Sequence, residues 1–191
     1  LEALRASLPP RGAALEIASG TGQHVVCFAQ GLNEWSWQPT EADARLLPAI
    51  ERRTALSGLT NVRPPVLLDV MSAAWPSACA AFSDGFDAVF CANMLHIAPL
   101  PTLAALMQGA ARHLRPGGVL ITYGPYLEAG PIAPSNQAFD ADLRARNPAW
   151  GIRHLDDVVQ EAARAGLALR SRQPMPANNL LLVFEAAATS A

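Results

Sequence analysis

Residues 15–23 have the sequence LEIASGTGQ, in which an apolar segment with one acid, Glu16, leads into a glycine-rich turn. Glycine suits a sharp bend that passes close to a ligand, because a Cβ there would collide. A helix expected at His24–Gln30 would direct its free N–H groups and partial positive charge at a carboxylate. We therefore expect a buried strand at Ala13–Ala18 and a ligand at the turn. The alternative is a tight strand–helix turn without a ligand.

Apolar runs and segments of helical periodicity alternate along the rest of the chain, which is typical of βαβ units and a mostly parallel sheet. Further strands are expected at Trp35–Pro39, Pro65–Val70, Phe86–Ala92, Val119–Tyr123, Ala168–Gln173 and Leu180–Ala186. Further helices are expected at Asp43–Leu56, Thr102–Leu114 and His154–Ala165. The proline-containing turn before the last strand predicts a hairpin, so this strand should be antiparallel.

The segment 124–150 has no clear periodicity and contains four prolines. It predicts a long connection with one short helix near Phe139–Arg144. A structureless stretch of this length inside a compact domain is usually functional, so we expect a lid or an active-site connection. The whole chain, residues 1–191, is expected to form a single domain, because this length suffices for one substantial core.

The composition excludes several classes of protein. With 51% hydrophobic and 16% charged residues the chain should be globular, and no apolar run approaches the ~20 residues of a membrane span. Cys27, Cys79 and Cys91 are far apart and form no C-x-x-C pair, so we expect no metal site, no disulfide framework and a cytoplasmic location. The net charge of −2 argues against broad nucleic-acid binding.

All 14 basic residues are arginine, and the chain has no lysine. P-loop phosphoryl transfer and Schiff-base chemistry are excluded, since each requires a lysine amine. A nicotinamide-dependent oxidoreductase is disfavoured as well. The dinucleotide fingerprint would have a third glycine where this chain has Val25, and a Tyr-x-x-x-Lys dyad is impossible here.

Two acids follow expected strands and could bind a nucleoside. Glu41 lies 19 residues after Gly22, where a carboxylate can accept hydrogen bonds from both ribose hydroxyls. Asp43 is the competing candidate for that role, or it could cap the next helix. Asp69 lies at the end of the third expected strand and could accept a hydrogen bond from an adenine amino group, with Val70 or Met71 donating an N–H to the ring. A turn-forming role is the alternative for Asp69.

Three segments together resemble the class I S-adenosylmethionine-dependent methyltransferases: the glycine-rich turn, FDAVFCANMLHI at residues 86–97 and LRPGG at residues 114–118. Five later segments are similar to the family typified by methyltransferase-like protein 26: YGPY at 123–126, SNQAFD at 135–140, RARNP at 144–148, WGIR at 150–153 and MPANNL at 175–180. The resemblance implies an α/β, Rossmann-like fold with a seven-stranded, mostly parallel sheet, an antiparallel last strand and helices on both faces. The implied strand order is 3-2-1-4-5-7-6.

The resemblance also implies S-adenosylmethionine as the cofactor. The expected cofactor-binding residues are Glu16, Ala18, Gly20, Thr21, Gly22, Glu41, Asp69, Val70 and Asn93. Ala18 stands where the usual loop of these enzymes has a glycine. We expect methyl transfer to a small-molecule acceptor that the sequence does not identify. A cofactor-binding protein without transfer activity, acting as a partner or sensor, is the alternative.

Candidate residues around the acceptor come from the segments after the fourth and fifth strands. If the acceptor must lose a proton, His96 and Tyr126 are the catalytic candidates, and Asp140 is a further possible base. Asn136, Arg144 and Arg146 are the candidates for substrate binding, and Arg153 belongs to the same group, since arginines can bind an anionic acceptor in a fork. A solvated face with one buried pair is the alternative for the arginines.

Overall fold

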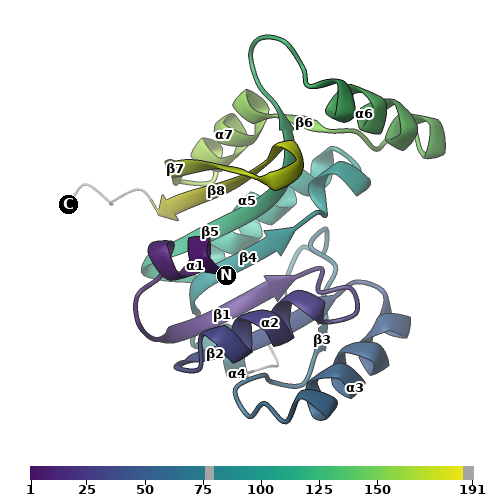
Figure 1. Ribbon diagram of the computed structural model, residues 1–191. Helices are drawn as coiled ribbons and strands as arrows, with labels where there is room; N and C mark the ends of the chain where they lie inside the picture. Colours follow the sequence, from purple (N-terminus) through teal and green to yellow (C-terminus); the bar gives the residue numbers. More distant parts are fainter. Residues whose placement is uncertain (76–79, 187–191) are drawn as a thin grey trace.

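The computed structural model describes residues 1–75 and 80–186, and Cys79 therefore lies outside the described residues. A twisted sheet runs through the middle of this part of the chain (Figure 1). Its strands are β1 (Gly12–Ile17), β2 (Trp35–Glu41), β3 (Val66–Leu67), β4 (Phe86–Ala92), β5 (Leu114–Leu127), β6 (Arg153–His154), β7 (Leu167–Met175) and β8 (Asn179–Ala186). Their order is β3-β2-β1-β4-β5-β8-β7, and β6 pairs with β5 beyond this path.

The pairing confirms the expected strand order and hairpin. The first five strands are mutually parallel, whereas β8 is antiparallel to both β5 and β7. The sheet of the described residues has eight strands and not seven, because the two-residue β6 adds to the edge of β5. The third strand is also shorter than Pro65–Val70. Pro65 has no N–H for a ladder, and a turn begins at Asp69, whose carbonyl accepts from the N–H of Ser72 (3.0 Å).

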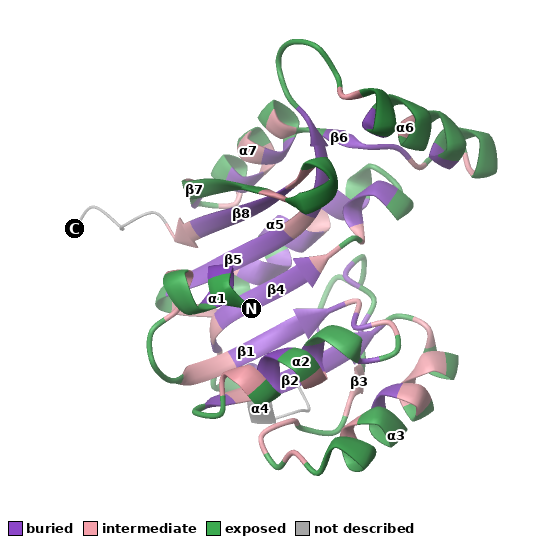
Figure 2. Cartoon of the chain, in the orientation of Figure 1, coloured by how far each residue is buried: buried purple, intermediate pink, exposed green. Residues whose placement is uncertain are grey.

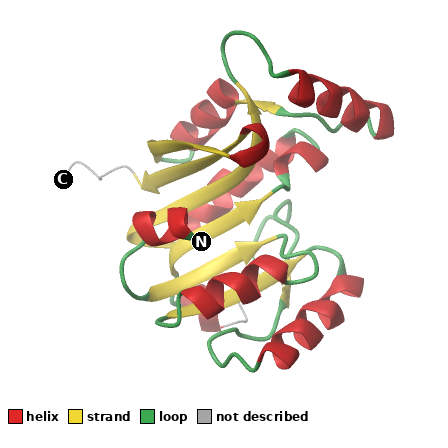
Figure 3. Cartoon of the chain, viewed as in Figure 1, coloured by secondary structure: helices red, strands yellow, loops and turns green. Residues whose placement is uncertain are grey.

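Helices cover both faces of the sheet (Figures 1 and 3). The α-helices are α1 (Glu2–Ser7), α2 (Gln23–Gly31), α3 (Leu47–Ser57), α4 (Ala80–Ser83), α5 (Pro101–His113), α6 (Pro134–Arg146) and α7 (Leu155–Arg164). Single 3-10 turns are η1 (Ala44–Leu46), η2 (Leu95–Ile97) and η3 (Pro176–Asn178). In the view of Figure 1, α1 and α2 lie in front of the sheet, and α5 and α7 lie behind it.

Two apolar clusters bury the two faces of the sheet. Behind it, Leu103, Leu106 and Met107 of α5 are fully buried at the spacing of three and four that the sequence predicts. In front of it, Phe28 of α2 packs against Trp37 of β2 with ring centroids 5.4 Å apart. Each such side chain stabilises the fold by roughly 1.5–3 kcal/mol. Figure 2 shows the resulting buried strands between exposed helix surfaces.

The segment 124–150 is more regular than the long connection with one short helix near Phe139–Arg144 that the sequence predicts. Strand β5 continues to Leu127, and the 13-residue helix α6 begins at Pro134. Proline has no N–H, but the first residue of a helix does not need one for a hydrogen bond within the helix. Only Asn136 and Leu143 of α6 are buried, so no continuous apolar stripe marks it in the sequence. The helix lies away from the sheet, mostly exposed, on the side where β4 ends (Figure 2).

Candidate functional site

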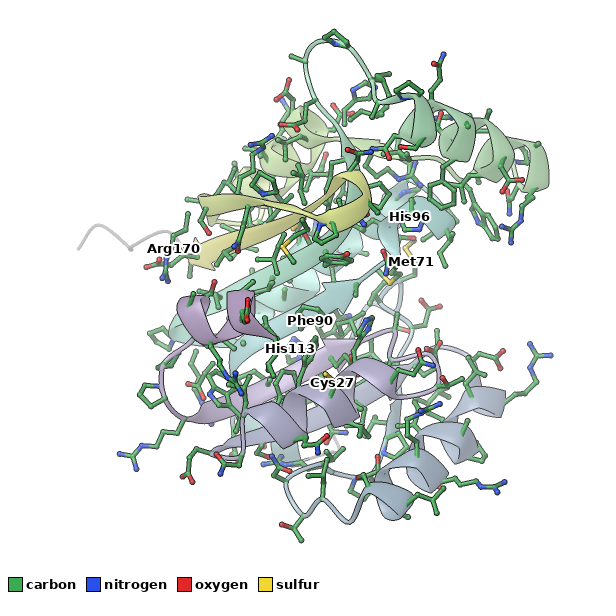
Figure 4. The ribbon with its side chains drawn as sticks, viewed as in Figure 1. Cys27, Met71, Phe90, His96, His113 and Arg170 are labelled. Carbon is green, nitrogen blue, oxygen red and sulfur yellow. The ribbon has the colours of Figure 1, made fainter. Side chains whose placement is uncertain are left out.

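Two adjoining cavities lie at the edge where the parallel strands end. The larger, which we name the first cavity, has a volume of about 660 Å³. Its wall takes residues from four strand ends, and among them are Ala18, Gly20, Glu41, Asp69, Val70, Met71, Asn93 and Met94. The glycine bend, Glu41 at the end of β2 and Asp69 after β3 therefore meet on one rim, as the sequence predicts. Figure 4 shows Met71 and His96 at this edge.

The bend after β1 uses left-handed backbone at three alternate residues, with φ of 55° at Ala18, 58° at Gly20 and 78° at Gly22. A Cβ added at Gly20 would meet no atom within 4 Å, so this residue leaves open space on the cavity side. A Cβ at Gly22 would approach Ile50 Cγ2 at 3.2 Å. Gly22 is thus required for close packing of α2 on α3, and the structure does not bring it to the cavity.

Thr21 is also directed away from the first cavity. Its side chain is exposed, and its carbonyl accepts a 2.7 Å hydrogen bond from Nε of Arg53 on α3. Of the bend residues expected to bind the cofactor, Ala18 and Gly20 line the cavity, whereas Thr21 and Gly22 do not.

Glu41 connects the end of β2 to the bend. Its Oε2 accepts a 2.8 Å hydrogen bond from the N–H of Gly20, and its Oε1 accepts from the N–H groups of Ala42 (2.8 Å) and Asp43 (3.2 Å). An ionised carboxylate can accept about four hydrogen bonds, so acceptor capacity remains toward the cavity. Asp43, the competing candidate, caps η1 through a 3.0 Å bond from the N–H of Arg45 and does not line the cavity.

Glu16 is buried within the sheet at 1% exposure and does not line the first cavity. Burial raises the pKa of Glu16 to about 8, against a smaller lowering by a hydrogen bond with Ser19; the nearby Glu41 carboxylate raises it further. Its Oε2 has no hydrogen-bond partner among the described residues. The neutral acid is therefore the favoured form near neutral pH.

Asp69 lines the first cavity in a turn that follows β3. Its Oδ1 accepts a 2.9 Å hydrogen bond from the N–H of Met71. This oxygen therefore has the turn-forming role that was the alternative interpretation of Asp69. The side chain is exposed, which leaves its other oxygen accessible to a ligand. The N–H of Met71 is already used by this bond, so Val70 is the better donor for a ring in the cavity.

The second cavity has a volume of about 470 Å³ and adjoins η2, α6 and η3. Its wall consists of Asn93, His96, Pro125, Ser135, Asn136, Phe139, Ala177 and Asn179. Asn93 lines both cavities, so the two meet there. This residue has a left-handed φ of 56°, and its N–H donates to the carbonyl of Tyr123 on the neighbouring strand (2.8 Å).

His96 is buried in the wall of the second cavity, and its ring meets that of Phe139 edge-on at 5.4 Å between centroids. Burial lowers the pKa of His96, and the charge of Arg153 lowers it further, so the imidazole is neutral at neutral pH. A Cβ added at Gly124 would lie 3.6 Å from both Nδ1 of His96 and Oδ1 of Asn93. The two polar groups therefore converge beside the backbone of β5.

Arg153 fixes the turn that contains His96. Its buried guanidinium donates to the carbonyls of Leu95 and Ala98, which flank His96, and the carbonyl of His96 accepts from the N–H of Gly151 (3.0 Å). Sequence reasoning grouped Arg153 with the other arginines of its region and missed this role. The sequence alone does not distinguish a buried guanidinium from an exposed one.

Three expected catalytic or substrate residues are not brought to either cavity. The Tyr126 hydroxyl donates to Oγ1 of Thr122 at 2.7 Å within the core, where burial raises the pKa of the phenol. Arg144 pairs with Asp140 at 2.7 Å, and Arg146 lies 5.3 Å from the ring centroid of Trp150. Asn136 does line the second cavity, where its Nδ2 donates to the carbonyl of Asn178 (3.3 Å).

Asp140, the further candidate base, is occupied by two partners. Burial would raise the pKa of Asp140, but hydrogen bonds from Arg144 and from the N–H of Ile152 outweigh it and lower the pKa. Phe139, which sequence reasoning gave no role, lines the second cavity although it is exposed.

Within residues 1–75 and 80–186, no cluster of side chains could hold a metal ion, and no helix is long and apolar enough to cross a membrane.

Comparisons with known proteins give a family and a fold. A family model described as "Protein of unknown function (DUF938)" matches residues 1–186. An O-methyltransferase family protein from Burkholderia thailandensis is similar in structure, with a TM-score of 0.77, 16% identity and coverage of 93% of this chain and 52% of that one. An O-methyltransferase family 2 protein from Planctomyces limnophilus DSM 3776, in complex with apigenin, has a TM-score of 0.77, 19% identity and coverage of 91% and 50%.

A third similar structure is the O-methyltransferase NcsB1 from neocarzinostatin biosynthesis, in complex with S-adenosylmethionine and 2-hydroxy-5-methyl naphthoic acid. Its TM-score is 0.73 at 19% identity, and the match covers 92% of this chain and 49% of that one. This chain thus spans about half the length of these structures. Together they show the Rossmann-like methyltransferase fold that the sequence predicts, while the similarity to the methyltransferase-like protein 26 family stays a prediction.

Proposed function

We propose that this chain, which belongs to the family described as "Protein of unknown function (DUF938)", is an S-adenosylmethionine-dependent methyltransferase with a small-molecule acceptor. The observation that supports this most directly is the meeting of the two cavities at Asn93. One cavity has the features of a nucleoside site, and the other is large enough for a small molecule. The solved structure that holds S-adenosylmethionine and a naphthoic acid has the same fold.

The residues of the first cavity fit the cofactor in charge and in hydrogen bonding. Glu41 would accept from the ribose hydroxyls, Asp69 from the adenine amino group, and the open side of Gly20 leaves room for the amino-acid part. Among the described residues, the wall contains two carboxylates and no basic side chain, which suits a cationic sulfonium. When bound, S-adenosylmethionine supplies an activated methyl group.

The residues of the second cavity would position the acceptor and handle its proton. Asn93, at the junction, can orient the acceptor through its amide. The neutral imidazole of His96 can take the proton that an acceptor hydroxyl gives up, and Arg153 holds the turn on which His96 lies. Positioning alone can contribute several kcal/mol to such a displacement.

Binding of the product S-adenosylhomocysteine tests the cofactor. At about 100 times its Kd, linkage predicts ~2.7 kcal/mol of stabilisation, hence a rise of roughly 5–10 °C in melting temperature. NADH is the matched control. A clear shift with NADH and none with S-adenosylhomocysteine would assign the chain to the oxidoreductases instead.

Transfer itself is tested by incubating the protein with methyl-labelled S-adenosylmethionine and a small-molecule extract. We expect a labelled product that depends on the protein. Tight S-adenosylhomocysteine binding without any labelled product across extracts would favour the alternative, a cofactor-binding partner or sensor.

A further inference from the structure

The wall of the second cavity contains no charged side chain among the described residues. Its polar groups are the amides of Asn93, Asn136 and Asn179, the hydroxyl of Ser135 and the imidazole of His96. A carboxylate, phosphate or ammonium group would lose hydration there without gaining an opposite charge, which costs several kcal/mol. The cavity therefore selects against charged ligands of either sign.

The three arginines of residues 144–153 are already engaged. Arg144 pairs with Asp140, Arg146 pairs with Asp142 (3.7 Å) and stacks over Trp150, and Arg153 donates to backbone carbonyls. Recruiting any of them for an anionic ligand would break these interactions. The expectation of an anionic acceptor held in an arginine fork is thus not supported by the geometry.

Phe139 gives the cavity an aromatic wall. It is 38% exposed on a helix whose surface is otherwise mostly polar, and its edge-on contact with His96 directs the ring to the cavity. A planar ligand beside it would bury apolar surface and could form an offset or edge-on aromatic pair. The wall is preformed, because Asn178 bonds to both Asn136 and Ser135 across the hairpin and α6.

We infer that the second cavity binds an uncharged aromatic molecule that carries a hydroxyl group, with its ring against Phe139 and its hydroxyl beside His96 and Asn93. This rests on the proposed function and names the class of acceptor. A hydroxyl both donates and accepts, so it matches the side-chain amide of Asn93 and the imidazole of His96, which converge next to Gly124.

Three naphthols that share the ring system and the hydroxyl position, but carry different charge, test this inference. They are 2-naphthol, the anionic 6-hydroxy-2-naphthoate and the cationic 6-(aminomethyl)-2-naphthol. Calorimetric titration of the full chain, saturated with S-adenosylhomocysteine, should give a Kd for 2-naphthol at least tenfold lower than for either charged analogue. Phe139→Ala should weaken 2-naphthol binding about tenfold, whereas Leu56→Ala, which removes an exposed side chain on α3, should leave it unchanged.

Equal or tighter binding of a charged analogue would overturn the inference, and so would an unchanged Kd in Phe139→Ala. Failure of 2-naphthol to bind a protein that binds S-adenosylhomocysteine would overturn it while leaving the proposed function intact. Failure of S-adenosylhomocysteine itself to bind would remove both.

Discussion

The backbone N–H of Gly20 donates a 2.8 Å hydrogen bond to Oε2 of Glu41, so the acid that ends β2 holds the bend that follows β1. A second connection between the same segments is the 2.8 Å bond from the N–H of Ser19 to the carbonyl of Thr40. These bonds fix the geometry of the bend before any ligand arrives. Glu41 therefore has two roles in our proposal, since it positions the loop and lines the cavity.

Glu41→Gln should weaken both stability and cofactor binding. An amide has one acceptor oxygen in place of two, so either Gly20 or the pair Ala42 and Asp43 loses a hydrogen-bond partner. We expect a loss of ~1–3 kcal/mol in urea unfolding and a weaker affinity for S-adenosylhomocysteine by calorimetry. Asp43→Asn, a change at a partly exposed acid outside the cavity that can still cap η1, is the control and should leave cofactor affinity unchanged and stability nearly unchanged.

Asp69→Asn should distinguish the turn-forming role of Asp69 from its role in ligand binding. The asparagine oxygen can still accept from the N–H of Met71, so we expect stability within ~0.5 kcal/mol of the parent chain. Its other atom becomes a donor and would face the adenine amino group, which weakens S-adenosylhomocysteine binding by ~1–3 kcal/mol. An unchanged affinity would show that Asp69 is only a turn former.

The sequence predicted the sheet and the rim of the first cavity because local patterns determine both. Apolar runs gave the strands, and parallel strands place the residues that follow them, such as Glu41 and Asp69, at one edge. Tyr126 was misplaced because β5 continues past Tyr123, and strand alternation then turns the phenol into the core. The extent of a strand depends on partners far away in the chain, here β8 as far as Pro125 and β6 at Tyr126 and Leu127.

The arginines of α6 were misjudged for a local reason. Asp140 and Asp142 precede Arg144 and Arg146 by four residues, a spacing that pairs opposite charges along a helix. A helix of this length at 134–146 would have predicted both pairs from the sequence. Only a short helix near Phe139–Arg144 was predicted, because the buried face of α6 consists of one amide and one leucine.

Glu16 should make the protein less stable as the pH rises above neutral. Burial raises its pKa from 4.5 to about 8, so the folded state binds the proton more tightly than the unfolded state. Its stabilising contribution is full below the unfolded pKa and is lost as the pH rises through 8. Between pH 7 and 8.5 we expect the free energy of unfolding to fall by ~1 kcal/mol in urea titrations.

The variant Glu16→Gln is the matched control for this pH dependence. It has no proton to lose, so its free energy of unfolding should stay nearly constant between pH 7 and 8.5. The same fall in the variant and the parent chain would assign the effect to other groups.

Ala18→Gly should stabilise the chain. Ala18 has a φ of 55°, and left-handed backbone costs an L-residue roughly 1–2 kcal/mol. Glycine removes that cost, but it gives the unfolded chain more conformational entropy, which lowers stability by ~0.4–1 kcal/mol. A net gain of ~0.5–1 kcal/mol in the free energy of unfolding is therefore expected in urea titrations. The reverse change, Gly58→Ala, occurs at a φ of 67° in open space and should destabilise by a similar amount. A loss of stability in Ala18→Gly would mean that the alanine methyl packs more favourably than its backbone is strained.

Gly124→Ala should reduce methyl transfer without harming the fold. The new Cβ would lie at the ordinary contact distance of 3.6 Å from Nδ1 of His96 and Oδ1 of Asn93, and the backbone of Gly124 is not left-handed. The free energy of unfolding should therefore stay the same or rise by up to ~1 kcal/mol. The methyl group would lie against the two groups that we propose contact the acceptor. With the acceptor found in the labelled extract, kcat/KM should fall at least tenfold, while the Kd for S-adenosylhomocysteine changes less than twofold. If kcat/KM is unaffected in a stable variant, the acceptor does not bind between His96 and Asn93, and the junction of the two cavities is not where transfer occurs.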